Sequence, residues 1–409
     1  MIDKIIEFFQ TPTLVGKVNR KLFGEVLTPI SLVNEILDGL PSSVWVNPDL
    51  RWLDPANGRG VFPAVVLQRL MLGLKQWQPD EEDRYKHIIE KMIHVCELQP
   101  ENMAKYVGIF DPQGKYKFNT FIGSFLTAEF DKHAQEIWGV KKFDVIVGNP
   151  PYNAGIDLQF LSKGINISNR LIIVHPATWL LDRKGTKKYN NIKKNLDQNL
   201  VAVKCFNGNL IFKIGLFVPC AIINWHKNHN NTCAVQYFDE RFTSNIWEIT
   251  KFGENWETKI KPVITKLETW HLGNMWAKRL GTKNLEGKHY CQIAAIRGHV
   301  NTSAKSTNKT IVQSDFYTLV MKDSSRNEGI RNDKVGHNGR IIFEFDTLTE
   351  RENFLEYCKT DFVRFCLSIY KNSQNNHRGE LKLIPWMDFT KKWTDEGLYA
   401  EFKTNSRNS

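Results

Sequence analysis

The feature that most constrains the fold is an apolar run, Phe143–Gly148, that is soon followed by two consecutive prolines, Pro150 and Pro151. Apolar runs with β-branched residues are typical of buried strands, and proline cannot continue a strand because it lacks the amide hydrogen. The sequence therefore predicts that Asn149 and Tyr152 lie at the carboxyl end of a strand. In open α/β sheets ligands bind beyond such strand ends, so a site is expected there.

The four residues Asn149, Pro150, Pro151 and Tyr152 suit a planar substrate with an exocyclic amine, such as adenine. The lone pair of such an amine is delocalised into the ring, so the amine attacks poorly. The side-chain oxygen of Asn149 and the carbonyl of Pro150 could accept its hydrogens and direct its lone pair toward an electrophilic methyl group. Tyr152 would stack on the ring. The alternative interpretation is a strand-ending turn without a catalytic role.

Composition limits the class of protein. The chain has 409 residues, 42% of them hydrophobic, and can bury a sizeable core, so we expect two domains. Its formal charge of +11 favours a polyanionic partner, although many basic proteins bind no nucleic acid. The seven cysteines form no C-x-x-C pair, which predicts neither a zinc site nor a disulfide framework. No apolar run approaches the roughly 18 to 20 residues of a membrane span. A cytoplasmic protein is therefore expected.

A second signal lies upstream of the diproline. A short strand at Leu50–Leu53 leads into the turn 54–60, with the sequence D-P-A-N-G-R-G, and then into an apolar helix. Gly58 and Gly60 would let the backbone approach a ligand, and Asp54 could hold an ammonium or hydroxyl group. The pattern is neither G-x-G-x-x-G nor a P-loop. A ligand with a nucleoside and an amino-acid moiety suits it better, and an ordinary βα turn is the alternative.

The strands that follow supply further candidates. Glu97 lies near the end of the predicted strand Ile93–Leu98, where a carboxylate can accept two hydroxyls from a ribose. Ser124 and Phe125 follow the next predicted strand, at Phe121-Ile122, and the aromatic ring could flank an adenine. Strands alternating with helices in this way predict a doubly wound parallel α/β sheet.

Thr28 precedes a predicted helix at the start of the same domain. It is followed by Pro29 and by apolar residues at helical spacing, so we expect Thr28 to cap that helix. A cap threonine can also offer its hydroxyl to a ligand carboxylate. Residues 1–22 ahead of it are expected to form an N-terminal arm.

Together these motifs resemble the adenine-N6 group of the amino-methylating DNA methyltransferases that use S-adenosyl-L-methionine. The resemblance covers residues 23–228, and N-P-P-Y joined to D-P-A-N-G-x-G at this spacing is highly specific. It implies a Rossmann-like doubly wound α/β methyltransferase domain at 23–245 and a mixed α+β target-recognition domain at 246–409. The implied reaction is methylation of adenine N6 in double-stranded DNA after base flipping, in a restriction-modification or orphan modification enzyme. A cognate restriction endonuclease is a candidate partner.

The resemblance also implies residue roles at matching positions. The implied cofactor contacts are Thr28, Asp54, Ala56, Gly58, Glu97, Ser124, Phe125, Asn149 and Pro151. The implied catalytic residues are Asn149, Pro150, Pro151, Tyr152 and Phe212. Phe212, or its rival Phe217, would stack on the displaced base opposite Tyr152. Ser124 departs from the family, which usually has an aspartate there to receive the amino group of the cofactor's adenine.

Other interpretations remain open. The N-P-P-Y motif also occurs in enzymes that methylate RNA adenines or a glutamine side chain of a protein, and the chain could be a non-catalytic DNA-binding subunit that kept the fold. In the C-terminal part, residues 297–301 and 322–340 are rich in residue types that read base edges, or are plain surface loops. The segments Leu381–Trp386 and Leu398-Tyr399 are expected to dock on a core. No metal site is predicted.

Overall fold

The computed structural model divides the chain into two compact units. The first comprises Met1–Leu181, Gly185–Ile214 and Pro219–Lys251, and the second comprises Phe252–Ser409 with Asp182–Lys184 and Gly215–Val218. The structure describes residues 2–10, 28–152, 155–180, 187–196, 199–212, 219–230, 232–237, 240–244, 289–293, 321–323, 342–370 and 384–402. Among these residues, no helix combines the length and the apolar character needed to cross a membrane.

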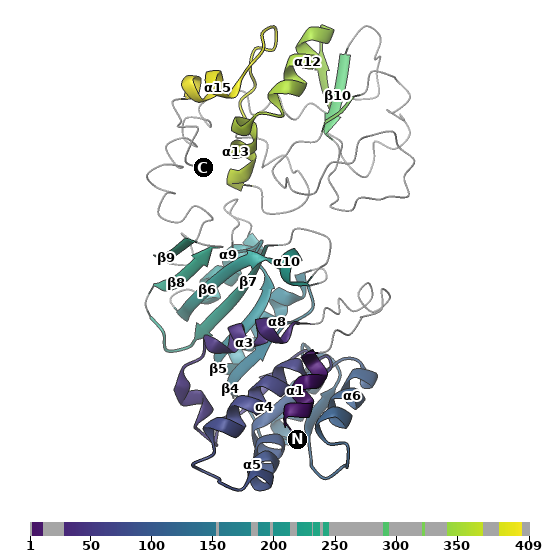
Figure 1. Cartoon of the computed structure of the whole chain (residues 1–409), viewed down its shortest axis with the longest axis vertical. Coiled ribbons are helices and arrows are strands. Elements are labelled where there is room, and N and C mark those ends of the chain that lie inside the picture. The colour runs from purple at the N-terminus through teal and green to yellow at the C-terminus, as the bar shows by residue number, and fades with distance from the viewer. Residues whose placement is uncertain are drawn as a thin grey trace. The chain divides into compact units, whose positions relative to one another are not determined.

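The first unit is built on a nine-stranded sheet with the order β3-β2-β1-β4-β5-β7-β6-β8-β9 (Figure 1). Its strands are β1 (Trp52–Asp54), β2 (Ile93–Glu97), β3 (Asn119–Ile122), β4 (Phe143–Gly148), β5 (Ser168–Pro176), β6 (Leu200–Asn207), β7 (Pro219–His226), β8 (Cys233–Tyr237) and β9 (Glu240–Ser244). The strands from β3 to β5 in this order are parallel to one another. This part confirms the expected Rossmann-like arrangement, and β4 has the predicted bounds.

The sheet departs from the expected all-parallel arrangement at β7 and β9. Strand β7 lies between β5 and β6 and is antiparallel to both, and β9 is antiparallel to β8. The reason is the length of the connections. Parallel neighbours need a crossover of about a dozen residues or more, whereas β8 and β9 are separated by only two residues and β6 is followed by the short helix α10 (Gly208–Phe212).

Helices cover both faces of this sheet. They are α3 (Ile30–Asp38), α4 (Val61–Gly73), α5 (Glu81–His87), α6 (Pro100–Phe110), α7 (Ala128–Glu136), α8 (Asp157–Ile167) and α9 (Lys187–Leu196). Successive side chains of a strand point to opposite faces. In β5, Leu171 and Ile173 join the core cluster that includes α7, α8 and α9. Ile172 lies against the end of α3, because a Cβ at Gly39 would be 2.9 Å from its Cδ1. The unit is therefore doubly wound.

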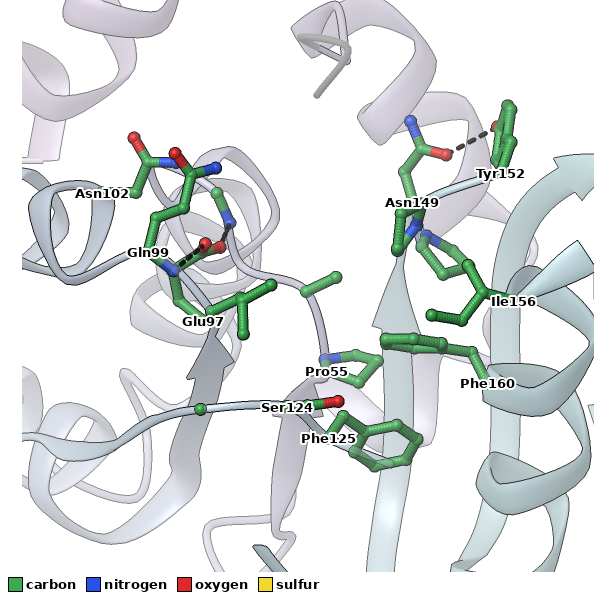
Figure 2. Close-up of a pocket in the computed structure, with 16 residues that line it drawn as sticks. Pro55, Glu97, Gln99, Asn102, Ser124, Phe125, Asn149, Tyr152, Ile156 and Phe160 are labelled. Carbon is green, nitrogen blue, oxygen red and sulfur yellow. Dashed lines mark hydrogen bonds between the residues drawn. The ribbon is translucent and has the colours of Figure 1, made fainter. Parts of the chain in front are cut away.

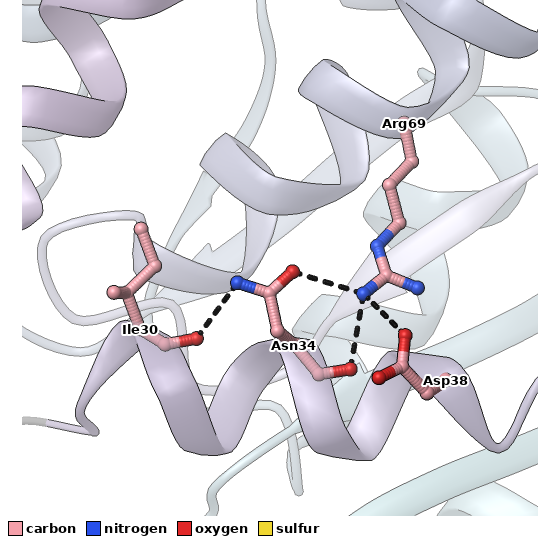
Figure 3. A network of polar contacts seen from close by, with 4 residues as sticks. All are labelled: Ile30, Asn34, Asp38 and Arg69. Atoms are coloured by element: carbon pink, nitrogen blue, oxygen red, sulfur yellow. Dashed lines mark hydrogen bonds and ion pairs between the residues drawn. The ribbon is translucent and has the colours of Figure 1, made fainter.

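A polar network fixes α3 on α4 (Figure 3). The guanidinium of Arg69 in α4 donates to the carbonyl and the side-chain oxygen of Asn34, at 3.0 and 2.9 Å, and pairs with Asp38 at 2.7 Å. The side-chain nitrogen of Asn34 donates to the backbone carbonyl of Ile30. Since Thr28 lies two positions ahead of α3, these contacts help to set the position of Thr28 near the carboxyl end of β4.

At the N-terminus, α1 (Ile2–Gln10) packs against α4. Ile5 and Ile6 are its buried residues, as expected of an amphipathic arm. Residues 11–27, which include the rest of the expected arm, lie outside the described part of the chain.

The second unit is a mixed α+β structure. Strands β10 (His289–Ile293), β11 (Met321–Asp323) and β12 (Ile342–Phe345) form an antiparallel sheet, and the helices are α12 (Leu348–Tyr357), α13 (Asp361–Tyr370) and α15 (Asp395–Phe402). Ile384 and Leu398 are fully buried in its aromatic core, which confirms that the segments predicted to dock on a core do so where they are described. Residues 297–301 and most of 322–340 lie outside the described residues. The target-recognition role of this unit stays a prediction.

Candidate active site

A pocket lies at the carboxyl ends of the parallel strands (Figure 2). It is lined by residues from the four ends that carry the predicted motifs: Ala56 and Gly58 after β1, Glu97 in β2, Ser124 and Phe125 after β3, and Asn149 to Tyr152 after β4. Strands β1 and β4 are neighbours in the sheet, and the order in which successive strands are added reverses between them. Open α/β sheets bind ligands at such a switch point. The tertiary structure thus gathers nine predicted residues in one place.

Three predicted residues are not among those that line the pocket: Thr28, Asp54 and Phe212. Phe212 is the last residue of α10 and is buried, with 6% of its surface exposed. Its stacking role therefore stays a prediction, and its rival Phe217 lies outside the described residues. Thr28 and Asp54 instead contact residues of the pocket motifs.

A chain of hydrogen bonds connects Thr28, Asn149 and Tyr152. The side-chain nitrogen of Asn149 donates to Thr28 Oγ1 at 3.0 Å, and the Tyr152 hydroxyl donates to Asn149 Oδ1 at 2.6 Å. Burial raises the pKa of Tyr152 well above its ordinary value, so the hydroxyl keeps the proton that it donates. Asn149 therefore has one orientation, with its oxygen on the Tyr152 side.

The expected capping role of Thr28 is wrong. Helix α3 begins at Ile30, its N-cap residue is Pro29, and no side chain in the described part of the chain caps it. An N-cap side chain must lie directly ahead of the first helical residue to reach the free amides. Thr28 lies one position too early, and its hydroxyl accepts from Asn149 instead.

The backbone ahead of Asn149 is closely packed against the turn after β1. Gly148 has φ of +159°, and a Cβ there would lie 3.0 Å from Asp54 Oδ1 and 3.3 Å from Pro55. A side chain at this position would push the two strand ends apart. Glycine at the end of β4 thus lets the N-P-P-Y segment lie beside the turn after β1.

Asp54 is a buried carboxyl group, with 3% of its surface exposed. Its Oδ1 accepts from the Ala56 amide at 3.1 Å, and its Oδ2 has no partner among the described residues. Desolvation raises the pKa of Asp54 to about 8, although the Ala56 hydrogen bond opposes the shift; the nearby charge of Glu97 adds to it. A neutral Asp54 is therefore favoured near pH 7 as long as no cation lies beside it.

Glu97 is held in a fixed orientation at the end of β2. Its Oε2 accepts from the Gly58 amide at 2.7 Å and its Oε1 from the Gln99 amide at 2.8 Å. Each carboxylate oxygen can accept a second hydrogen bond. Glu97 lines the pocket, where a carboxylate suits the hydroxyl groups of a ligand.

Gly58 and Gly60, the two glycines of the turn after β1, have different roles. Gly58 has φ of +56°, and no atom of the described residues lies within 4 Å of the place where a Cβ would be. Gly60 has φ of +99°, and a Cβ there would be 2.5 Å from the Tyr106 ring. Gly58 therefore leaves room at the pocket, as predicted. The expectation that Gly60 approaches a ligand is wrong, because its open side is filled by the aromatic core.

The sequence did not predict the other seven lining residues, which include Leu98, Asn102 and Phe160. Leu98 is 56% exposed, and an apolar residue directly after a strand-end carboxylate was a usable signal. Phe160 belongs to α8 and lies near the Phe125 ring, with centroids 5.2 Å apart. In the sequence, the helical spacing of Phe160 and its apolar neighbours indicated only a position in the core. Nothing in the local pattern singled out Asn102.

Fold and site together define the class of protein. The sheet is a Rossmann-like doubly wound α/β fold with a pocket at its switch point, as the resemblance to S-adenosylmethionine-dependent methyltransferases implies. The lining fits this cofactor: Gly58 leaves space, Glu97 offers a carboxylate, and Leu98 and Phe160 offer apolar surface. S-adenosyl-L-methionine is therefore the expected cofactor.

Comparison with curated proteins agrees with this class. No known protein-family profile matches the chain. An uncharacterized adenine-specific methylase of Mycoplasma pneumoniae (strain ATCC 29342 / M129 / Subtype 1) is 25% identical over 254 residues, covering 43% of this chain and 60% of that protein. The match spans less than two thirds of the relative's length. It confirms the resemblance to adenine-specific methyltransferases.

Solved structures similar to the chain include the M protein of the type I restriction enzyme EcoKI, with a TM-score of 0.39, 17% identity, and coverage of 53% of this chain and 49% of that chain. Another is the ATP-dependent type ISP restriction-modification enzyme LlaBIII bound to DNA, with a TM-score of 0.41, 14% identity, and coverage of 59% and 22%. Because both scores are low, the fold class rests on the chain's own sheet order.

Proposed function

We propose that this chain is a site-specific DNA methyltransferase that transfers a methyl group from S-adenosyl-L-methionine to adenine N6. One observation carries the proposal. The N-P-P-Y segment after β4 lines the same pocket as the turn after β1 and the Glu97 carboxylate of β2. Groups that suit an exocyclic amine and groups that suit a nucleoside with an amino-acid moiety are thus placed side by side.

When bound, S-adenosyl-L-methionine supplies a methyl group activated by a sulfonium. The protein's part is to prepare the amine. Asn149 Oδ1 and the Pro150 carbonyl accept the N6 hydrogens, which concentrates the lone pair on the nitrogen. Pro150 and Pro151 fix the backbone that carries these acceptors. No general base is required, because the methylated amine becomes acidic and loses its proton to water.

The target base must leave the duplex to reach this pocket. Extrusion of a base is unfavourable by a few kcal/mol, and stacking in the protein offsets this cost. Tyr152 lines the pocket and supplies one aromatic face. We assign the aromatic face on the opposite side of the base to Phe212. We assign recognition of the DNA sequence to the second unit. A restriction-modification system, with a cognate endonuclease, or an orphan modification enzyme fits this role.

The test is transfer of tritium-labelled methyl groups to duplex DNA and, in parallel, to structured RNA. Wild-type protein is expected to label DNA at adenine N6, and labelling of RNA alone would replace the proposed substrate. Asn149→Ala should abolish transfer and keep cofactor binding. The control is Asn166→Ala, at an exposed position of α8. Full activity of Asn149→Ala would contradict the role of Asn149.

A further inference from the structure

Asn102 is a buried polar residue of the pocket with an unused donor. It lies in the first turn of α6, and 3% of its surface is exposed. It lines the same pocket as Glu97. Its side-chain Nδ2 is buried and has no hydrogen-bond partner among the described residues. Figure 2 shows this nitrogen directed toward the side of the pocket where Gln99 and Glu97 lie.

An unpaired buried amide is unfavourable by about 1 to 3 kcal/mol, and most buried polar side chains have a partner. The backbone amide of Asn102 is already satisfied, because it donates to the Gln99 carbonyl at 3.1 Å. Helix formation therefore does not explain an amide side chain here, since an apolar residue would fill the same volume without this cost. A ligand that offers an acceptor would explain it.

The neighbouring groups specify the kind of acceptor. Glu97 accepts from the amides of Gly58 and Gln99, and carboxylate oxygens accept hydrogen bonds but do not donate them. Adjacent hydroxyl groups that donate to Glu97 keep lone pairs on their own oxygens. Those hydroxyl oxygens need a donor close to the Glu97 carboxylate. Asn102 lines the same pocket, and its Nδ2 has no partner among the described residues.

We propose that Asn102 recognises the ribose of the bound nucleoside by donating from Nδ2 to a hydroxyl oxygen, while Glu97 accepts the hydroxyl hydrogens. This inference rests on the proposed function, because it takes the nucleoside to be the cofactor. It adds a positioning residue that no motif marks. Asn102 acts on binding and has no part in the chemistry at the amine.

The first measurement is the dissociation constant of S-adenosylhomocysteine by calorimetry. Wild-type protein is expected to bind. Asn102→Ala and Asn102→Leu should each weaken binding by roughly 2- to 12-fold, the range expected for loss of one net hydrogen bond. Asn102→Asp, which keeps the size but offers only acceptors beside Glu97, should weaken it more. Asn166→Ala is the matched control and should bind as the wild type does.

The second measurement separates ribose recognition from a general packing role. The same constants are determined for the 2′-deoxy and 3′-deoxy analogues of S-adenosylhomocysteine. One of the two deoxy analogues lacks the oxygen that Asn102 contacts. The wild type and Asn102→Leu should bind that analogue with almost equal affinity. If Asn102→Leu weakens all three ligands by the same factor, or none of them, Asn102 does not contact the ribose.

These outcomes keep the two proposals apart. No binding by the wild type would overturn the cofactor assignment, and this inference with it. Binding by the wild type with unchanged affinity in all three Asn102 variants would overturn this inference alone. Melting curves identify any variant that does not fold. The Leu and Asp variants, which are close to asparagine in size, carry the comparison if the Ala variant is unfolded.

Discussion

Thr28 Oγ1 accepts a hydrogen bond from Asn149 Nδ2 at 3.0 Å, across 121 positions of the chain. An amide can be turned so that either its nitrogen or its oxygen faces a given neighbour. The contact with Thr28 and the one with the Tyr152 hydroxyl on the opposite atom select one orientation. Thr28 thus helps to position Asn149 Oδ1, the oxygen that we propose accepts the hydrogens of the amine.

Thr28→Val should lower kcat by roughly 2- to 12-fold, because it removes the acceptor for Asn149 Nδ2 and with it one net hydrogen bond. Thr28→Ser keeps the hydroxyl and should stay close to the wild type. Methyl transfer at saturating cofactor gives kcat, and calorimetry gives cofactor affinity. A weaker affinity with unchanged kcat would instead show that Thr28 contacts the cofactor directly.

Tyr152→Phe should keep most of the activity. The ring that stacks on the base remains, and the Thr28 contact still sets the orientation of Asn149 when the 2.6 Å contact is lost. Tyr152→Ala removes the ring and should lower kcat/KM by roughly 5- to 150-fold, the range for stacking of one base. Rates on one DNA substrate compare the two variants. Equal losses in both would contradict the stacking role.

Asp54 should make the stability of the protein depend on pH. Its pKa is raised from 3.8 to about 8 in the folded state. Between these values the folded protein holds a proton that the unfolded chain has lost, so stability falls as pH rises, by up to about 1.4 kcal/mol per pH unit. Above the folded-state pKa this dependence ends. Asp54→Asn keeps an acceptor for the Ala56 amide and should remove this slope.

Urea midpoints of the wild type and Asp54→Asn between pH 5 and pH 9, taken together with the slope of each unfolding curve, measure this difference. Asp49→Asn, at an exposed position, is the control. A difference between wild type and Asp54→Asn that does not change with pH would show that Asp54 is ionised throughout.

Gly60→Ala should destabilise the protein by at least about 1 kcal/mol, since overpacking a core commonly has this effect. Its φ of +99° disfavours a side chain, and the new Cβ would be 2.5 Å from the Tyr106 ring. Gly108→Ala is the control, because Gly108 is an exposed residue of α6 with no atom near its Cβ position. That change should be neutral or stabilise by up to about 1 kcal/mol. Melting temperatures of both variants test the contrast.

The sequence by itself determined the carboxyl ends of β1, β2 and β4 to within one residue, and it determined the motif positions. Apolar β-branched runs, glycine-rich turns and prolines act through local backbone preferences. For this reason β4 ends at Gly148 as predicted, and the turn after β1 presents Gly58 to the pocket. The order of these motifs also indicated the class of enzyme.

Only the tertiary structure decided which side chains meet. The insertion of β7 between β5 and β6, the packing of Gly60 on Tyr106 and the Thr28–Asn149 contact all join segments distant in the chain. Local preferences carry no information about such contacts, because these depend on sheet order and on which volumes remain to be filled. Asn102 is the clearest case: its side-chain nitrogen is buried without a hydrogen-bond partner among the described residues, which no sequence pattern records.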